Sequence, residues 1–214
     1  AYEIPLRRVG SEMCIRDSYR EMETAYRPGH ADLTYNLKYG IRDHRGGGRA
    51  SARETAARVF AGAMALEALR PSGISVTAKI VRIGELNDPS EAQIAEAIAA
   101  AKADNDTLGG IVECKVCGTP SGLGEPVFDK LQARLGAAMM SIPAVKGFDY
   151  GIGFDGCARR GSELADTITV GPRMPLNIAG GILGGISTGE PITMRVAFKP
   201  ISTMTRPMST ITPD

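Results

Sequence analysis

SARETAARVFAGAMALEALRPSGISVTAKIVRI, residues 51–83, joins a helical pattern to a strand pattern and decides the fold class. Ser51 and Glu54 form an S-x-x-E capping box, and apolar residues follow at helical spacing, so a helix is predicted from Ser51. Pro-Ser-Gly at 71–73 ends that helix. Residues 74–83 are β-branched and roughly alternating, which predicts a strand.

The same order of capped helix, breaker and strand recurs along the chain. Asp88 and Pro89 predict the cap and the first residue of a second helix, with Glu91 completing a capping box. A third helix is predicted from about Pro126. The residues expected on the inner faces of these two helices are Ile94, Ala97, Ile98 and Ala101, and Phe128, Leu131, Leu135 and Met139.

Several further strands are expected. They are predicted at 108–116, 145–154 and 192–198, with a short strand or turn at 166–171. The helix–strand units at 51–83 and 125–154 look like a degenerate internal duplication. Because no low-complexity linker divides the chain, we expect one domain of the α+β or α/β type.

Length and charge exclude several classes of protein. The 214 residues suffice for one large domain or two small ones. Twenty-five Lys and Arg residues against 24 Asp and Glu residues leave a net charge of +1, which argues against bulk binding of nucleic acid or a membrane surface. No apolar run is long enough for a membrane span. We therefore expect a soluble, cytoplasmic protein with neither nucleic acid nor membrane as a partner.

Residues 1–18 have no clear period and are set aside. The nine residues 10–18, GSEMCIRDS, resemble the conceptual translation of the end of a transposon-based sequencing adapter. We interpret 1–18 as a non-native, adapter-like tail and place no chemistry there. An ordinary N-terminal tail is the alternative.

The stretch 42–54, RDHRGGGRASARE, is the best candidate binding site on physical grounds. Its three glycines expose a run of backbone N–H groups and lead into the positive end of a helix. The arginines around this turn, whose planar guanidinium groups suit phosphate or carboxylate, are Arg42, Arg45, Arg49 and Arg53. We predict an anion site here. A glycine turn with solvated arginines is the alternative.

The chain contains two histidines, His30 and His44. His30 lies in the turn RPGHAD, residues 27–32, between a cation and a carboxylate. A neighbouring carboxylate favours the protonated imidazole, which makes His30 a candidate proton donor near neutral pH. A solvated loop histidine is the alternative, and His44 is expected at the surface or at a pocket rim.

The cysteines do not predict a metal site. Cys114 and Cys117 form a C-x-x-C pair, but no second pair of ligands accompanies them. Positions i and i+3 of a strand point to opposite faces, so these two thiols cannot share a metal. We expect two strand residues, with Cys157 as an isolated thiol.

The segment 177–203 combines paired glycines with a cation and hydroxyl groups. Gly180-Gly181 and Gly184-Gly185 suit a backbone packed flat against a planar ligand or against another backbone. The polar residues just past the last predicted strand, where loops of layered folds place functional groups, are Lys199, Ser202 and Thr203. A glycine-rich turn region without a ligand is the alternative.

These motifs together closely resemble one family, chorismate synthase. They are RPGHAD (27–32), KYGIRDHRGGGRASARE (38–54), GLGEPVFDKL (122–131), SIPAVKG (141–147), and AGGILGGISTGEPI with FKPIST (179–203). They occur in family order and spacing and cover nearly all of 19–214.

The resemblance implies a fold and an activity. The implied fold is a layered β-α-β sandwich of the α+β class, with helices packed between antiparallel sheets. The implied protein is a homotetrameric carbon–oxygen lyase that requires reduced FMN, with NADPH as a candidate reductant. It converts 5-enolpyruvylshikimate 3-phosphate to chorismate by 1,4-anti elimination of phosphate and a proton, the last common step of aromatic amino acid biosynthesis.

The resemblance also assigns roles to residues. His30 is similar to the family histidine that protonates or stabilises reduced flavin, and Arg27 and Arg53 are the candidate substrate cations. The implied FMN contacts are Arg49, Ala50, Ser51, Pro143, Ala144, Gly184, Lys199, Pro200, Ile201, Ser202 and Thr203. Pro143 stands where the family often has asparagine, and because proline lacks an N–H, no backbone N–H contact is expected there. Ala50 and Ile201 stand where relatives often carry a hydroxyl, so their contacts would be backbone or apolar.

Several family motifs do not occur in the sequence. They include a Gly-Glu-Ser-His-Gly turn with a second catalytic histidine and an Arg-His-Asp-Pro motif. We therefore interpret 19–214 as the central part of a single chorismate synthase-like domain, truncated at both ends, and expect the chain alone to be inactive. The alternatives are a non-catalytic flavin- or phosphate-binding module on the same fold, and a flavin reductase.

Overall fold

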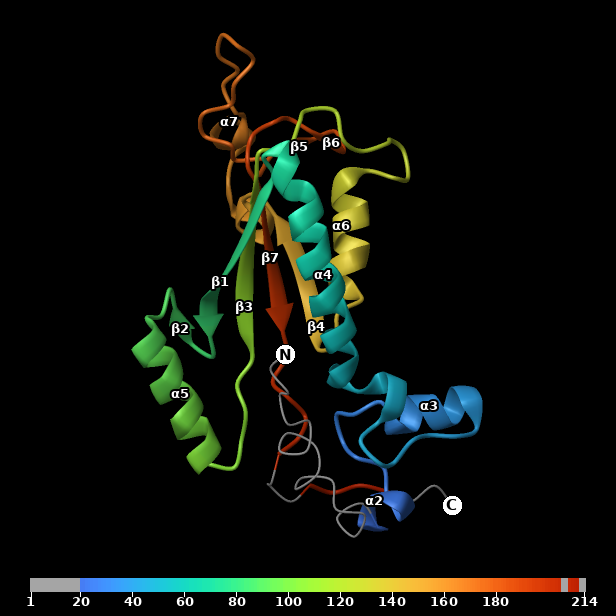
Figure 1. Ribbon diagram of the computed structural model, residues 1–214. Helices are drawn as coiled ribbons and strands as arrows, with labels where there is room; N and C mark the ends of the chain where they lie inside the picture. The colour runs from blue at the N-terminus through green and yellow to red at the C-terminus, as the bar shows by residue number, and fades with distance from the viewer. Residues whose placement is uncertain (1–19, 205–207, 212–214) are drawn as a thin grey trace. The chain divides into compact units, whose positions relative to one another are not determined.

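The computed structural model describes residues 20–204 and 208–211, which fall into two compact units (Figure 1). The first unit comprises the described residues of 1–54 and 202–214, and the second unit is Thr55–Ile201. The adapter-like tail predicted at 1–18 lies outside the described residues. No helix in the described part of the chain is long and apolar enough to cross a membrane.

The second unit is built on a five-stranded antiparallel sheet in the order β2-β1-β3-β7-β4. Its strands are β1 (Ser75–Ile83), β2 (Leu86–Asn87), β3 (Gly110–Cys117), β4 (Val145–Tyr150) and β7 (Ile192–Phe198). The strands predicted at 74–83, 108–116 and 192–198 are confirmed. The strand predicted at 145–154 is too long, because Gly151 turns the chain with a φ of 58°. The α+β class with an antiparallel sheet is therefore confirmed.

Helices and short hairpins complete the two units. The first unit contains α2 (Arg20–Thr24), α3 (Asp32–Tyr39), η2 (Gly48–Ala50) and η3 (Ala52–Glu54). The second contains α4 (Thr55–Leu69), η4 (Arg70–Ser72), α5 (Glu91–Ala103), α6 (Leu131–Met140), η5 (Gly153–Ala158), α7 (Gly161–Leu164), β5 (Ile182–Leu183) and β6 (Ile186–Ser187). Residues 166–171 form a turn region with one isolated bridge, between Thr169 and Arg173.

The core of the second unit lies between the sheet and α6. Its buried centre is Ile182, Ile192 and Met194, and the helix residues packed against it are Leu131, Leu135 and Met139. These three predicted inner residues are confirmed. Phe128 is not one of them, since its side chain is 91% exposed. It precedes the helix, which begins at Leu131, where the backbone N–H donates to the carbonyl of Gly185.

The helix predicted from Ser51 begins four residues later, at Thr55. The capping box fails because its two side chains are engaged elsewhere. The Ser51 hydroxyl accepts from the N–H of Arg53 at 3.3 Å. The Glu54 carboxylate accepts from Arg49 at 3.0 Å instead of reaching back to the backbone.

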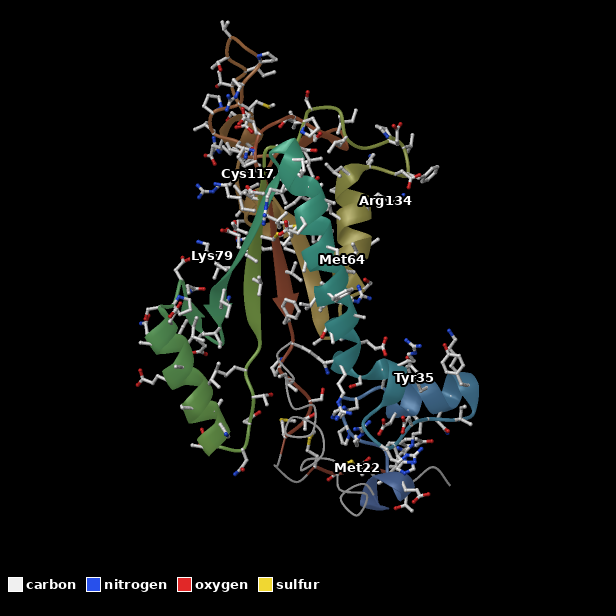
Figure 2. All side chains as sticks on the ribbon, viewed as in Figure 1. Met22, Tyr35, Met64, Lys79, Cys117 and Arg134 are labelled. Carbon is white, nitrogen blue, oxygen red and sulfur yellow. The ribbon has the colours of Figure 1, made fainter. Side chains whose placement is uncertain are left out.

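Helix α4 exposes apolar side chains along its length. Figure 1 shows α4 and α6 on the same face of the sheet, and Figure 2 shows Met64 standing out from α4. Phe60 of α4 is 70% exposed, and no residue of this helix is buried. Helix α4 thus has the sheet on one side and leaves Phe60 and Met64 exposed.

The cap predicted for α5 is displaced by two residues. Ser90, not Asp88, is the N-cap, and Gln93 completes the capping box with hydrogen bonds in both directions. Of the predicted inner stripe, Ile94, Ala97 and Ala101 are half-buried, and Ile98 is exposed. The stripe is therefore wrong at Ile98, since α5 lies beside the sheet edge and not over its centre (Figure 1).

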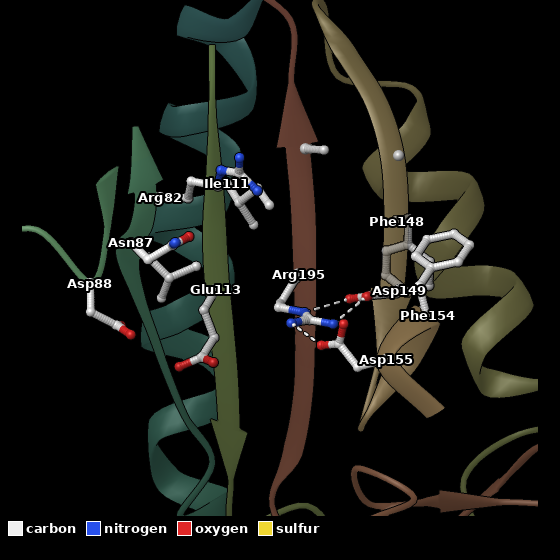
Figure 3. Close-up of a pocket in the computed structure, with 13 residues that line it drawn as sticks. Arg82, Asn87, Asp88, Ile111, Glu113, Phe148, Asp149, Phe154, Asp155 and Arg195 are labelled. Carbon is white, nitrogen blue, oxygen red and sulfur yellow. Dashed lines mark hydrogen bonds and ion pairs between the residues drawn. The ribbon is translucent and has the colours of Figure 1, made fainter. Parts of the chain in front are cut away.

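The opposite face of the sheet is polar (Figure 3). The Arg195 guanidinium donates to both oxygens of Asp149, at 3.0 and 2.6 Å, and to Asp155 at 3.1 Å. These bonds raise the pKa of Arg195 well above its ordinary value, so the cation persists. A groove of about 530 Å³ lies over this cluster, and no residue of the predicted site lines it.

The packing generates a stability test. Replacing Met194, which is 2% exposed, with alanine should lower the free energy of unfolding by about 2–5 kcal/mol. Phe128→Ala is the control and should change it by less than about 0.5 kcal/mol, because the exposed ring fills no cavity. Urea denaturation measures both, and equal losses would contradict the core assignment.

Candidate functional site

One buried carboxylate organises the first unit. Asp32, the first residue of α3, is 3% exposed. It accepts hydrogen bonds from the backbone N–H of Arg27 at 3.1 Å, from its Nε at 2.8 Å and from its Nη2 at 2.7 Å. Arg42 Nη1 approaches the same carboxylate at 3.4 Å. This bidentate pairing fixes the orientation of the Arg27 side chain.

The surroundings of Asp32 favour its ionised form. Burial alone would raise the pKa of this carboxyl. The hydrogen bonds from Arg27 and the charges of Arg27 and Arg42 outweigh burial, and together they hold the pKa of Asp32 below its ordinary value of 3.8. The ion pair with Arg27 therefore persists throughout the neutral range.

Arg42 is occupied in holding the unit together. Its Nη2 donates to the carbonyls of Met22 and Ala25 at 2.7 and 3.1 Å, and its guanidinium lies 5.2 Å from the ring centroid of Tyr26. The carbonyls at the end of α2 are thereby satisfied. Arg42, which the sequence predicts among the anion ligands around the glycine turn, therefore has a structural role.

The turn that contains His30 packs against the C-terminal segment of the same unit. The N–H of His30 donates to the carbonyl of Arg27 at 3.2 Å, which closes the turn. The Ser202 hydroxyl donates to the carbonyl of Gly29 at 2.7 Å. A Cβ atom on Gly29, whose φ is 73°, would lie 2.9 Å from that hydroxyl oxygen. Glycine is therefore required for Ser202 to lie beside the turn.

The triple-glycine turn lies next to Arg27. Gly46, Gly47 and Gly48 all have positive φ, at 96°, 86° and 49°. A Cβ on Gly47 would lie 3.5 Å from Arg27 Nη2, so the turn and the guanidinium are neighbours. The structure thus brings Arg27, the His30 turn, the glycine turn and Ser202 together. Arg49, at 84% exposure of its side chain, stands in solvent and pairs with Glu54.

The remaining predicted site residues of the first unit follow from this arrangement. Ala50 and Ser51 extend directly from the glycine turn, where their N–H groups donate to the carbonyls of Gly47 and Gly48 at 2.9 and 3.0 Å. Arg53 is exposed in η3, and Thr203 follows Ser202 as an exposed residue. His44 is half-buried.

A second group of predicted residues gathers in the second unit. The N–H of Val145 donates to the carbonyl of Ile142 at 3.2 Å, and Ala144 has a φ of 69°, so residues 142–145 form a type II turn. Proline is favoured at the second position of such a turn, which accounts for Pro143. The N–H of Lys199 donates to the carbonyl of Ala144 at 2.9 Å.

The segment after Lys199 is also anchored. Thr107 Oγ1 donates to the carbonyl of Ile201 at 2.7 Å. Pro200 lies 3.0 Å from where a Cβ on Gly109 would stand, so it packs on a glycine that leaves room for it. Pro143, Ala144, Lys199, Pro200 and Ile201 thus form one connected region.

Gly184 does not join that region. Gly184 and Gly185 have φ values of 59° and 97° and form the two-residue turn between β5 and β6. The hairpin packs through Ile182 against Ile192 at the start of β7, whereas Lys199 follows the end of that strand (Figure 1). The other glycine pair meets backbone as well, because Gly180 abuts Gly151.

The cysteines take the positions expected of strand residues. Cys114 and Cys117 lie on β3, opposite Met194 and Ser75 respectively, three residues apart and so on opposite faces. Burial raises the pKa of the Cys114 thiol. Cys157 is exposed in η5. Over the described range, no group of three or more His, Cys, Asp and Glu side chains is arranged to hold a metal ion.

Comparison with known proteins identifies the family. The family model for chorismate synthase matches residues 9–214. The chain belongs to the chorismate synthase family. The match begins within the stretch interpreted as adapter-like, and that interpretation stays a prediction.

Individual relatives agree. The chorismate synthase of Christiangramia forsetii is 47% identical over 215 residues, covering 90% of this chain and 60% of the relative. That of Opitutus terrae is 44% identical over 221 residues, covering 91% and 61%. A crystal structure of a chorismate synthase superposes with a TM-score of 0.74 and 33% identity, over 80% of this chain and 63% of that one. The chain spans about 60% of the length of these curated chorismate synthases.

Sequence reasoning missed two residues that anchor segments of the predicted site, Asp32 in the first unit and Ser141 in the second. Asp32 was noted only as a neighbour of His30, although a carboxylate five residues after Arg27 at a helix start could have indicated the ion pair. Ser141 begins the SIPAVKG motif, and its bonds to Arg58 at 2.9 and 3.1 Å join residues 83 positions apart. No local pattern predicts that contact.

Removing the Asp32 charge should destabilise the chain. Asp32→Asn leaves two arginines against a neutral amide and should lower the free energy of unfolding by about 3 kcal/mol at pH 7. Asp43→Asn is the control and should cost less than about 1 kcal/mol, since Asp43 lies in an exposed pair with Arg45.

The Asp32 effect should also depend on pH. Because the folded pKa of Asp32 is lowered, its contribution is complete above the ordinary carboxyl pKa and is lost as pH falls through the folded value. Urea denaturation at pH 7 and at pH 3 should show the difference between the parent chain and Asp32→Asn shrinking at the lower pH. A difference that grew on acidification would contradict the assignment.

The turn at 142–145 gives a local test of backbone strain. Ala144→Gly should stabilise the chain by about 1 kcal/mol, because Ala144 has a positive φ that glycine adopts freely. Ala137→Gly, an exposed position inside α6, is the matched control and should cost about 1 kcal/mol. Thermal unfolding measures both, and a loss at position 144 equal to the loss at 137 would exclude the left-handed conformation.

Proposed function

We propose that this chain is part of a chorismate synthase, a carbon–oxygen lyase that eliminates phosphate from 5-enolpyruvylshikimate 3-phosphate to give chorismate and requires reduced FMN. The observation that supports it most is the juxtaposition in the first unit of Arg27, the His30 turn, the triple-glycine turn and Ser202. The proposed reaction is taken from the family. The arrangement in the first unit provides a cation and an imidazole that suit this reaction.

The residues present fit an anionic ligand. The Arg27 guanidinium is oriented by Asp32 before any ligand arrives, so little side-chain entropy is lost when it binds phosphate or carboxylate. In the glycine turn next to it, the N–H groups of Gly46 and Gly47 donate to the carbonyls of His44 and Asp43, so the Arg27 cation is the group proposed to meet the anion. Arg53 is the second proposed substrate cation.

The same regions suit FMN. The proposed contacts are Arg49, Ala50 and Ser51 after the glycine turn, Pro143 and Ala144 in the type II turn, and Lys199, Pro200, Ile201, Ser202 and Thr203 along one continuous segment. When bound, reduced FMN supplies electron density that assists cleavage of the carbon–oxygen bond. Gly184, at the far end of β7 from Lys199, remains a prediction from the resemblance.

His30 is the proposed proton-transfer residue. It lies half-buried in the turn closed by Arg27 and fastened by Ser202. A turn held at both sides keeps the imidazole in one place, which proton transfer requires. Asp32 is a positioning residue here, because it holds Arg27 at the start of the same turn.

The finer parts of the proposal rest on the family. We propose a homotetramer in the cytoplasm, with NADPH as a candidate reductant for the flavin. A non-catalytic flavin- or phosphate-binding module on the same fold is the alternative.

Binding of the two proposed ligands tests the function. Reduced FMN should bind this chain, and 5-enolpyruvylshikimate 3-phosphate should tighten that binding and change the flavin absorption spectrum. Arg27→Gln should weaken the effect of the substrate roughly tenfold or more, because the proposed charged hydrogen-bond donor to the substrate is lost. Arg70→Gln, which removes only an exposed pair with Glu67, is the control.

The alternatives give different results. An FMN affinity that does not change when 5-enolpyruvylshikimate 3-phosphate is added would favour the non-catalytic module. Consumption of NADPH without any response to the substrate would favour a flavin reductase. Chorismate formation by this chain would support the activity and overturn the expectation that the chain alone is inactive.

A further inference from the structure

Arg58 links the beginning of α4 to the end of α6. It is the fourth residue of α4, and its two terminal nitrogens reach the same residue. Nη1 donates to the Ser141 hydroxyl at 2.9 Å and Nη2 donates to the Ser141 carbonyl at 3.1 Å. Figure 1 shows the two helices running in opposite directions on one face of the sheet, which brings these ends together.

Ser141 is the C-terminal cap of α6. Its N–H donates to the carbonyl of Ala137, and its hydroxyl donates to the carbonyl of Ala138 at 2.6 Å. The last turn of α6 contains no basic residue of its own. A helix ends with unpaired carbonyls and partial negative charge, so a guanidinium from a neighbouring helix is favourable there.

Ser141 is also the residue directly before the type II turn at 142–145. Ala144 holds a φ of 69° in that turn, a conformation that a residue with a Cβ adopts only when its surroundings impose it. The surroundings act on both sides. Arg58 fixes the chain where it enters the turn, and the N–H of Lys199 binds the Ala144 carbonyl at 2.9 Å where it leaves.

We propose that Arg58 is a positioning residue for the flavin contact at Pro143 and Ala144. It acts through Ser141, by holding the entry of the turn so that Ala144 keeps its left-handed conformation and its bond to Lys199. The inference rests on the proposed function, because the flavin contact at this turn is part of that proposal.

The core does not depend on Arg58. The buried cluster of Ile182, Ile192 and Met194 is packed by the inner face of α6, whereas Arg58 is exposed on α4. Loss of the guanidinium should therefore loosen the turn without unfolding the sheet and its helix. This separates a positioning role from a general contribution to stability.

Three variants test the role. Arg58→Gln removes the cation and should weaken FMN binding roughly tenfold, as expected for loss of hydrogen bonds from a charged donor. Arg58→Lys keeps the charge but not the two-nitrogen fork and should recover part of that loss. Arg134→Gln is the matched control on α6, where the arginine pairs only with exposed Asp129 among the interactions described for it, and FMN binding should not change.

Amide hydrogen exchange provides a readout without ligand. The N–H groups of Val145 and Lys199, which hold the turn, should exchange roughly tenfold faster in Arg58→Gln than in Arg134→Gln. Exchange inside β3 and β7 should be the same in the two variants. An increase spread over the whole second unit would mean that Arg58 is merely structural and would overturn the inference.

The outcomes separate the two proposals. If the parent chain binds FMN and Arg58→Gln binds it equally well, the positioning role is wrong while the proposed function stands. If the parent chain does not bind FMN, the proposed function fails and the inference fails with it. Weaker binding in Arg58→Gln, partial recovery in Arg58→Lys and faster exchange confined to Val145 and Lys199 would together support the role.

Discussion

The Asp32 carboxylate is the constraint on which the first unit depends. It lies almost out of solvent and takes hydrogen bonds from Arg27 and Arg42. Each arginine also has a second role, since Arg42 satisfies the end of α2 and Arg27 lies beside the glycine turn. A charged group that is buried without partners is costly, so each member of this cluster keeps the others in place. The Asp32 carboxylate thus orients Arg27, the cation proposed to bind the anionic ligand.

The second unit uses a different device to place its functional segments. Antiparallel pairing of β7 with β3 and β4 fixes Lys199 relative to the turn at 142–145, because β4 begins directly after that turn. The register shift between Val145 and Gly147 falls at the same point, so the regular ladder starts just beyond it. The two segments proposed to contact flavin therefore meet at one end of the sheet, and the conformation of Ala144 is maintained by its neighbours.

The sequence predicted the elements better than their ends. Hydrophobic periodicity predicted most strands, α5 and the inner residues of α6. The spacing of apolar residues, 3.6 in a helix and 2 in a strand, can be recognised without knowing the tertiary contacts. Caps were misplaced at Ser51 and Asp88 because several nearby side chains could make the same local bonds: Glu54 pairs with Arg49, and Ser90 caps α5 in place of Asp88. The role of Arg58 could not be predicted, because its partner Ser141 lies 83 residues away in the sequence. The resemblance implied contacts to one flavin from Ser51, Lys199 and Ser202, and the structure places Ser202 beside the His30 turn in the first unit and Lys199 in the second.

The glycine pairs show why a motif does not by itself define a ligand site. Gly184 and Gly185 are accounted for by a hairpin turn that needs two positive φ angles, and Gly180 by close contact with the backbone of Gly151. Neither explanation requires a flavin. At Gly47, by contrast, the Arg27 guanidinium lies beside the glycine, so a proposed anion would meet a cation there. A glycine turn that binds a ligand is therefore distinguished from one that only packs by the charged side chains beside it, and not by its number of glycines.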